Sequence, residues 1–488
     1  MSGGHKPREP LLFERSVPGR SGHALPPAFG DASRADQHIP ESLRRKTGTL
    51  LPEIDEPSVV RHYTRLSSWN HGVDTGMYPL GSCTMKYNPR INEALCRLPG
   101  FGRLHPYVPE DMCPGALQLI GELGEYLKEI SGFAGITLQP AAGAHGELTG
   151  IKLIRAYHQD RGNPRKRVLV PDTAHGTNPA SSKFGGYNVV EIQSGPAGIL
   201  EAEAVSQVMD EDVAAVMITN PNTLGLFESN IGKIAEIVHR AGGLVYCDGA
   251  NLNSMMGIAR PGDMGIDLMQ FNLHKTLSTP HGGGGPGSGP VGVAGPLVDF
   301  LPVPLVEKTA GGYRLTTDRP KSIGRVKSFY GQFAVMVRAY VYIRELGGPG
   351  LKLASEMAVL NANYIRARLE DTYYLPYPQQ SMHEVIFSDK NLEETGVTTL
   401  DVAKRLLDYG FHPPTVYFPL VVHGALMIEP TETESPETLD EFVAAMKKIA
   451  EEARTDPDLV RTAPHTTVVR RLDEVKAARE PVLTWKPT

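Results

Sequence analysis

The sequence has little cysteine and no cysteine pair of a type that builds a small metal or redox site. Four cysteines stand among 488 residues, and none of them belongs to a CxxC motif. This argues against a zinc ribbon and a thioredoxin-type centre, and no metal site is expected. Thiols scattered through a long chain are typical of a reducing compartment, so we expect a cytoplasmic protein. The cysteines are Cys83, Cys96, Cys113 and Cys247.

Long apolar runs and excess positive charge are also missing. No apolar run is long enough to span a bilayer, so no membrane association is expected. The N-terminal segment MSGGHKPREPLLFERSVPGR lacks the apolar stretch of a secretory signal. A formal net charge of -6 argues against a dedicated nucleic-acid binder.

The composition that is present, 41% apolar and 21% charged residues, is typical of a soluble globular protein. A chain of 488 residues is too long for one ordinary core, which predicts two or more domains. We predict an N-terminal arm and loop segment over 1–110, a large α/β domain over 111–330 and a small α+β domain over 331–488. An ordered arm of this kind would lie on a partner chain.

Apolar spacing predicts alternating helices and strands in the middle of the chain. The strands are short, apolar and rich in β-branched residues without strict alternation, which favours a mostly parallel sheet covered on both faces. Helices are predicted over 115–130, 143–158, 231–242 and 331–347, and in the C-terminal part over 398–409 and 436–453. Strands are predicted over 167–171, 188–192, 213–219, 243–248 and 267–272, and later at HEVIFS and ALMIEP.

The segment DLMQFNLHKTLSTPHGGGGPG, residues 267–287, combines the end of a strand, a lysine and a run of glycines. Gly282, Gly284 and Gly287 formally match G-x-G-x-x-G. A dinucleotide fingerprint must open a helix, whereas this loop leads into PVGVAG, another predicted strand. No Gly-Lys-Ser/Thr follows it either, so a P-loop is excluded.

Lys275 in this segment stands at the carboxyl end of a predicted sheet strand, where open α/β folds bind ligands. Most lysines are solvated surface groups, and Lys275 would be interpreted in the same way if its sequence context were ignored. Lysine amines also form Schiff bases with aldehydes, including that of pyridoxal 5'-phosphate (PLP). This cofactor further needs a carboxylate at its ring nitrogen, a phosphate site and a flat group over the ring.

Each further requirement has a candidate residue. Asp248 ends the strand GLVYCD, 27 residues before the lysine (275 minus 248), and could instead be a turn residue in DGAN. Gly143, Ala144, His145 and Gly146 open a helix whose free N–H groups suit an anion. An ordinary glycine-rich turn would look the same. His175 follows the strand RVLVP and could cover the ring or be a hydrogen-bonded structural residue. Four separate strand ends thus supply compatible parts.

Seven longer strings resemble the glycine cleavage system P-protein family, glycine dehydrogenase (decarboxylating). They run in order from about residue 75 to 435, and LLFERSVPGR near the N-terminus is similar to the two-chain form of the family. The chain is similar to the C-terminal half of the longer single-chain members, so it resembles the second (beta) subunit of the split form. The strings are MYPLGSCTMKYNP, LQPAAGAHGE, PDTAHGTNPAS, ITNPNTLGLFE, YCDGANLN, LHKTLSTPHGGGGPG and FPLVVHGALMIEPTETES.

The resemblance implies PLP-dependent fold type I, aspartate aminotransferase-like, with PLP bound covalently to Lys275. It implies catalytic roles for Lys275, Asp248 and His175, and phosphate contacts from His274 and, more weakly, Thr276. The implied reaction is decarboxylation of glycine, release of CO2 and transfer of the aminomethyl group to the lipoyl group of H-protein. The implied partners are lipoylated H-protein and an alpha subunit, in an α2β2 assembly.

Two other functions stay open. Another fold type I PLP amino-acid decarboxylase would share Lys275, Asp248 and His175, without needing the HGGGGPG segment or a lipoyl partner. A non-catalytic scaffold subunit would keep the fold, but it would not need an intact lysine in its full context.

Overall fold

The computed structural model describes residues 9–22, 38–283 and 287–484. It divides into two compact units, one of residues 73–465 and the other of Met1–Gly72 with Thr466–Thr488. Of the predicted glycine-rich loop, Gly284 lies outside the described residues. None of the described helices is long and apolar enough to cross a membrane.

The larger unit is built on a seven-stranded sheet with the order β1-β7-β6-β5-β4-β2-β3. Strands β3, β2, β4, β5 and β6 are parallel, whereas β7 runs antiparallel to both β6 and β1. The strands are β1 (Gly135–Thr137), β2 (Arg167–Pro171), β3 (Asn188–Ile192), β4 (Val213–Thr219), β5 (Leu244–Gly249), β6 (Leu268–Phe271) and β7 (Val291–Val293).

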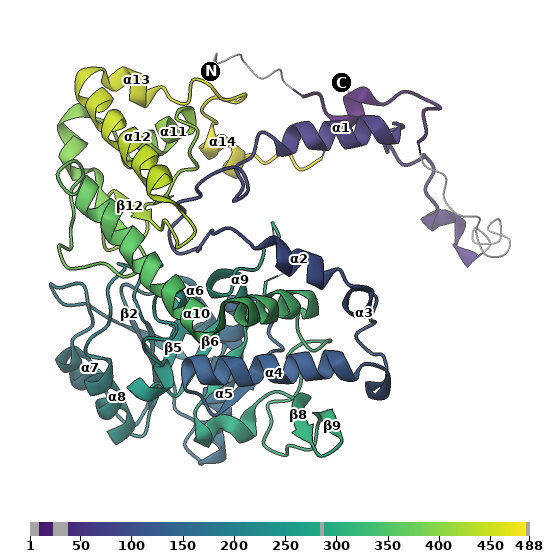
Figure 1. The fold of residues 1–488 in the computed structure, drawn as a ribbon, viewed down its shortest axis with the longest axis vertical. Helices are drawn as coiled ribbons and strands as arrows, with labels where there is room; N and C mark the ends of the chain where they lie inside the picture. The colour runs from purple at the N-terminus through teal and green to yellow at the C-terminus, as the bar shows by residue number, and fades with distance from the viewer. Residues whose placement is uncertain (1–8, 23–37, 284–286, 485–488) are drawn as a thin grey trace. The chain divides into compact units, whose positions relative to one another are not determined.

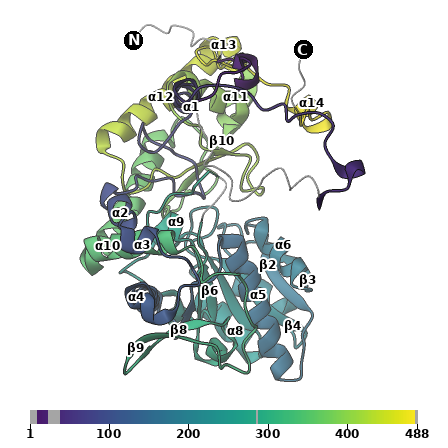
Figure 2. The same cartoon turned by 90° about the vertical axis from the view of Figure 1, so that its right-hand side faces the viewer.

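Helices cover both faces of this sheet, which is why strands such as β4 and β5 are buried along their whole length (Figure 2). One face packs on α4 (Pro114–Ser131), α7 (Ala202–Val208), α8 (Ile231–Arg240) and the start of α10 (Phe333–Leu369). The other face packs on α5 (Gly143–Asp160), beside α6 (Thr177–Phe184). The five parallel strands predicted from the sequence are confirmed, three of them with the same bounds.

Helix α10 links two cores. Its first half packs with Val335 and Met336 in the core against the sheet, and its second half packs with Ile365 and Leu369 in a second core. The helix is interrupted at Gly347, where φ is 59° and ψ is -178°. Figure 1 shows α10 lying above α4 and rising toward α12.

The second core lies around a three-stranded antiparallel sheet of order β10-β12-β11. Its strands are β10 (Val385–Ser388), β11 (Thr415–Val416) and β12 (Ala425–Ile428), and its helices are α11 (Thr399–Asp408), α12 (Pro436–Thr455) and α13 (Pro457–Arg461). The strands and the two longer helices predicted there are confirmed. Apart from short 3-10 helices, the remaining elements described in the larger unit are α2 (Arg90–Cys96), α3 (Pro99–Gly102), α9 (Leu273–Thr276) and the hairpin of β8 (Leu305–Thr309) and β9 (Gly312–Thr316).

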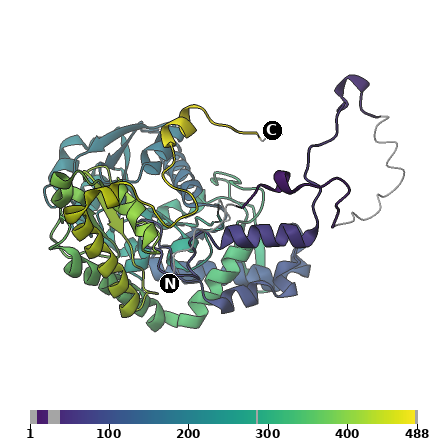
Figure 3. The ribbon, with the colours of Figure 1, turned by 90° about the horizontal axis from the view of Figure 1, so that it is seen from above.

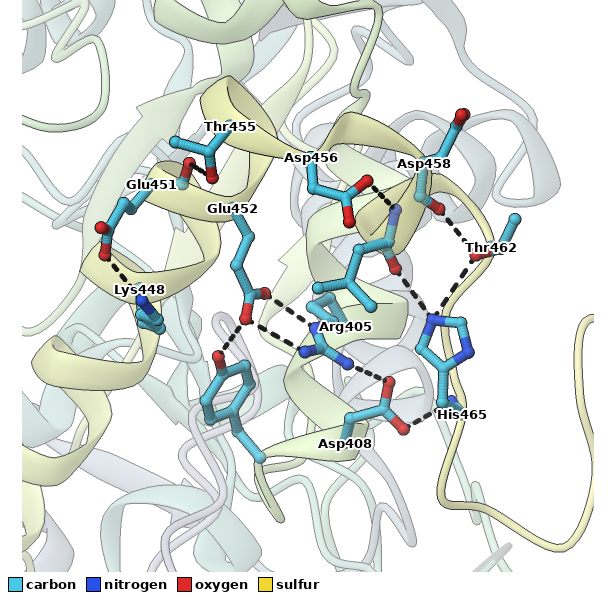
Figure 4. Close-up of polar contacts among 12 residues, drawn as sticks. Arg405, Asp408, Lys448, Glu451, Glu452, Thr455, Asp456, Asp458, Thr462 and His465 are labelled. Carbon is cyan, nitrogen blue, oxygen red and sulfur yellow. Dashed lines mark hydrogen bonds and ion pairs between the residues drawn. The ribbon is translucent and has the colours of Figure 1, made fainter.

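A polar cluster joins α11 to α12 (Figure 4). Arg405 donates to both oxygens of Glu452, at 2.9 and 3.1 Å, and to Asp408 at 2.9 Å. The other oxygen of Asp408 accepts from the backbone N–H of His465 at 2.6 Å. Bidentate geometry with little exposure makes this cluster a structural clamp rather than a reactive site.

The terminal unit contains α1 (Glu56–Ser67), the dark helix of Figure 3, together with α14 (Glu474–Arg479). Glu9 accepts two hydrogen bonds from Arg65, at 2.6 and 2.7 Å, and lies 3.0 Å from Nδ1 of His62. The arm predicted from the sequence is therefore held in part by its own polar contacts.

Phe387 of β10 is fully buried in the second core, whereas Phe184 at the end of α6 is 79% exposed. Phe387→Ala should lower the free energy of unfolding by about 3–5 kcal/mol, because a large buried ring is replaced by a cavity. Phe184→Ala, the matched control, should change it by about 0.5 kcal/mol or less. Denaturant titration followed by circular dichroism measures both, and equal losses would contradict the packing described.

Candidate active site

The parallel register places a row of polar side chains at the carboxyl ends of three strands. Thr219 of β4 pairs with Asp248 of β5, and Asp248 pairs with Gln270 of β6. Residues paired across neighbouring strands point to the same side of a sheet. All three side chains line one cavity, so the sheet itself aligns them.

Asp248 is buried and held at both carboxylate oxygens. Oδ2 accepts from the side chain of Asn178 at 2.9 Å, and Oδ1 accepts from the backbone N–H of Ala250 at 3.0 Å. The amide of Gln270 also donates to Oδ1, while its own oxygen accepts from the hydroxyl of Tyr246. The orientation of this carboxylate is therefore fixed from three directions.

Glu147 of α5 lies beside Asp248 and binds two hydroxyl groups. Thr177 donates to Oε1 at 2.7 Å and Ser181 donates to Oε2 at 3.0 Å. Burial and the nearby charge of Asp248 together raise the pKa of Glu147 from 4.5 to about 7. A pKa this high favours a proton on Glu147 beside Asp248.

Lys275 lies on α9, a single turn that begins two residues after β6 ends. The sequence placed it on the strand end itself, and the structure places it on this turn. Its Nζ lines the cavity and donates to the backbone oxygen of Ser82 at 2.8 Å. The lysine is half-buried and no carboxylate within the described ranges forms an ion pair with it.

His274, directly before the lysine, also lines the cavity and packs edge-on against His281 with ring centroids 5.1 Å apart. Its Nδ1 accepts from the backbone N–H of Ser288 at 3.3 Å. Burial, with His281 close by, lowers the pKa of His274 to about 3, and burial lowers that of His281 to about 4. Both rings are therefore neutral near pH 7.

The first turn of α5 faces the same cavity through Gly143 and Ala144. No side chain of the described residues caps this helix, so its first backbone N–H groups remain available to an anion. A Cβ on Gly143 would stand 2.6 Å from Oδ1 of Asn272, so any larger residue would force the side chain of Asn272 to move.

His175 lies between β2 and α6 at the edge of the cavity. Its Nδ1 accepts from the backbone N–H of Thr177 at 3.2 Å, and its ring lies 5.6 Å from that of Phe418. Desolvation on its packed side lowers the pKa of His175, which favours a neutral ring.

The cavity has a volume of about 180 Å³ and brings together six of the residues predicted from the sequence. These are Gly143, Ala144, His175, Asp248, His274 and Lys275. Ser82 also lines it and belongs to the segment SCTMK, residues 82–86, whose sequence suggested substrate or partner contacts. Sequence reasoning assigned no role to the other lining residues, which are Glu147, Thr177, Thr219, Thr223, Ala250, Asn251, Gln270 and Asn272. The register of β4, β5 and β6 was the signal that could have found Thr219 and Gln270.

Three predicted residues do not line this cavity. His145 turns back, and its Nδ1 accepts from the backbone N–H of Ala141 at 3.1 Å. The N–H of Gly146 donates to the oxygen of Ala142 at 2.9 Å and is therefore occupied within the helix. The backbone oxygen of Thr276 accepts from Lys86 at 3.0 Å, and Thr276 lines a separate small pocket. Phosphate contacts by these three residues stay a prediction.

The residues of the cavity fit PLP. The cavity combines the half-buried Lys275, the fixed carboxylate of Asp248, the uncapped N-terminus of α5 and the imidazole of His175. The hydroxyl of Thr219 is also buried without a partner among the described residues, so a ligand atom could satisfy it.

The fold is that of the PLP-dependent aminotransferase class. Residues 149–284 match the family model "Aminotransferase class-V". The structure resembles an aspartate aminotransferase of Thermus thermophilus with a TM-score of 0.58 at 14% identity, over 77% of this chain and 99% of that one. It resembles glycine decarboxylase (P-protein) of the glycine cleavage system, in inhibitor-bound form, with a TM-score of 0.73 at 22% identity, over 86% and 95%. The predicted fold class is confirmed.

Sequence comparison identifies the family within that class. Residues 354–465 match the model "Glycine dehydrogenase, C-terminal domain". The "Probable glycine dehydrogenase (decarboxylating) subunit 2" of Caldanaerobacter subterraneus subsp. tengcongensis is 57% identical over 476 residues, 97% of this chain and 98% of that relative. The chain belongs to the glycine dehydrogenase (decarboxylating) subunit 2 family, as its resemblance indicated.

Glu147→Gln should change how stability depends on pH. The folded protein holds a proton on Glu147 that the unfolded chain releases above pH 4.5, so this contribution is full below pH 4.5 and is lost as the pH rises to about 7. The free energy of unfolding of the variant should therefore rise relative to that of wild type by about 1.4 kcal/mol per pH unit across that window. Thermal unfolding at several pH values measures the gain.

The matched control for this measurement is Glu203→Gln, which changes an exposed carboxylate on α7. A Glu147→Gln curve parallel to wild type at every pH would contradict a protonated Glu147.

Proposed function

We propose that this chain carries the catalytic site for decarboxylation of glycine, with release of CO2 and transfer of the aminomethyl group to the lipoyl group of H-protein. One observation supports this most. Lys275 and a fixed, buried Asp248 line a single cavity at the carboxyl ends of parallel strands, in a chain of the glycine dehydrogenase family.

We infer that PLP binds in this cavity with its aldehyde carbon on Lys275. Asp248 would hold the ring nitrogen, the first turn of α5 would hold the phosphate, and His175 would cover the ring. His274 and Thr276 are further candidates for the phosphate. When bound, PLP supplies an electron-withdrawing ring that accepts the electron pair left behind as the carboxylate departs as CO2.

The chain itself would contribute orientation, charge and exclusion of water. Asp248 presents a negative charge that favours a protonated ring nitrogen, and its three donors keep that charge in place. Neutral His274 adds no second positive charge beside Lys275. The backbone oxygen of Ser82 would hold the ε-ammonium group of Lys275 while substrate occupies the cavity.

The subunit 2 family implies a subunit 1, and we propose that the two chains assemble as α2β2 and receive lipoylated H-protein. We keep the proposed division into 1–110, 111–330 with the PLP site, and 331–488, and a cytoplasmic location. The role of a non-catalytic scaffold gains no support, because Lys275 lines the same cavity as Asp248, His175 and the first turn of α5.

Lys275→Ala should abolish covalent cofactor binding. Wild-type protein, purified with its alpha partner and supplied with PLP, should show the visible absorption band of a protein-bound Schiff base, and borohydride should fix the label on Lys275. The variant should show neither, whereas Lys352→Ala, which removes an exposed lysine of α10, should behave as wild type. A band that survives in Lys275→Ala would refute the assignment.

Glycine–bicarbonate exchange should identify the substrate. The paired chains with lipoylated H-protein should move labelled bicarbonate carbon into glycine, and Asp248→Ala should reduce the rate by about 100-fold or more, because the ring would lose its charged partner. Bound PLP without exchange would favour a different fold type I decarboxylase.

A further inference from the structure

A second group of ionisable side chains is buried close to Lys275, outside the cavity. His383, Glu384 and Glu429 are all fully buried, and one ligand-type atom from each lies within 4.8 Å of the others. The charge of Lys275 acts on all three. The two glutamates also hold the loop whose Ser82 oxygen binds Lys275.

The hydrogen bonds of Glu429 are those of an ionised carboxylate. Its Oε2 accepts from the backbone N–H of Thr84 at 2.8 Å, and its Oε1 accepts from the hydroxyl of Thr84 at 2.6 Å and from Asn253 at 3.4 Å. All three groups donate in this structure, and two of them, the N–H of Thr84 and the amide of Asn253, can only donate, so the hydrogen bonds favour a negative charge on Glu429.

Glu384 has a different environment. Its Oε2 accepts from the backbone N–H of Ser82 at 2.8 Å, but its Oε1 has no hydrogen-bond partner within the described part of the chain. Nε2 of His383 lies 3.6 Å from this oxygen, and neither ring nitrogen of His383 has a hydrogen-bond partner among the described residues. A bare, charged oxygen buried here would be costly, whereas a protonated oxygen can donate toward the imidazole.

The surrounding charges are consistent with one proton on the pair formed by Glu384 and Glu429. Burial and the charge of Glu429 raise the pKa of Glu384, and burial lowers the pKa of His383 to about 3. Burial raises the pKa of Glu429 as well, and raises that of Cys83 to about 11. The titratable groups that face the pair are Cys83, Lys275, His383 and Glu432. Of these, Glu432 is paired with Lys86 at 2.5 Å, which leaves Lys275 to balance one negative charge.

We propose that Glu384 holds a proton beside Lys275 while Glu429 remains ionised, which makes Glu384 a positioning residue of the lysine site. The proton limits the pair to a single negative charge, the amount that Lys275 balances. Glu384 also fixes Ser82, whose backbone oxygen binds Lys275. This inference rests on the proposed function of Lys275 and assigns the charge state that surrounds it.

A divalent cation is the competing occupant of this cluster. Both oxygens of Glu429 already accept strong hydrogen bonds, and a cation would add positive charge close to that of Lys275. The geometry therefore favours a proton, and the experiment includes a metal analysis.

The proton can be observed by infrared difference spectroscopy of the full chain without PLP at neutral pH. Glu384→Gln should remove a protonated-carboxyl band relative to wild type, because an amide replaces the neutral acid with nearly the same shape. Glu429→Gln should disturb folding more, since an amide nitrogen cannot accept the donors of Thr84. Glu394→Gln, an exposed control, should leave the band unchanged.

The pH dependence of stability gives a second, independent readout. The unfolded chain loses the proton above pH 4.5, so its contribution to wild-type stability is full below that pH and falls as the pH rises. The folded-to-unfolded ratio of Glu384→Gln should therefore gain on that of wild type by up to about tenfold per pH unit above pH 4.5.

Three results would overturn the proposal. They are an unchanged infrared band in Glu384→Gln, a stability difference that does not vary with pH, and a stoichiometric metal ion in purified wild type that Glu384→Gln loses. If Glu429→Gln does not fold, the comparison of Glu384→Gln with wild type still tests whether Glu384 holds a proton. These readouts need neither PLP nor glycine, whereas borohydride labelling of Lys275 tests the proposed function, so the two failures are distinguishable.

Discussion

The lysine site depends on a short loop that three carboxylates, two buried and one half-buried, hold in place. Alternate residues of this loop, Ser82, Thr84 and Lys86, bind Glu384, Glu429 and Glu432 in turn. Ser82 and Thr84 have φ angles of 63° and 52°, which cost about 1–3 kcal/mol each for residues with a Cβ. Such strain persists because the surrounding hydrogen bonds over-determine the loop. The loop in turn fixes the backbone oxygen that binds Lys275.

The sheet positions both the carboxylate and the lysine of the site. Register alone aligns Thr219, Asp248 and Gln270, and the turn after β6 brings Lys275 to the same edge. The cavity is therefore built on two rigid supports, the strand ends on one side and the clamped loop on the other. Charge is kept low between them, because His175 and His274 are neutral and Glu147 takes up a proton.

Much of this arrangement follows from local sequence. Apolar, β-branched runs predicted the five parallel strands, and strand ends predicted Asp248 and Lys275, because chain order and sheet geometry are closely linked in alternating α/β folds. Other features depend on contacts between distant residues. Glu384 and Glu429 lie within the predicted strands HEVIFS and ALMIEP, and no local pattern indicates that the loop at Ser82 packs on them. The orientation of the His145 ring likewise depends on its hydrogen bond with the backbone N–H of Ala141. The helical spacing of apolar residues does not predict this contact.

The hydrogen bonds that hold the loop at Ser82 and Thr84 affect the order in which the site forms. Ser82 and Glu384 are separated by 302 residues, and Thr84 and Glu429 by 345. During synthesis the sheet, with Asp248 and Lys275, leaves the ribosome well before Glu429 exists. The nascent chain therefore carries its reactive lysine for a time without the contacts that confine it, and the site matures only when the last strand of the second sheet is in place.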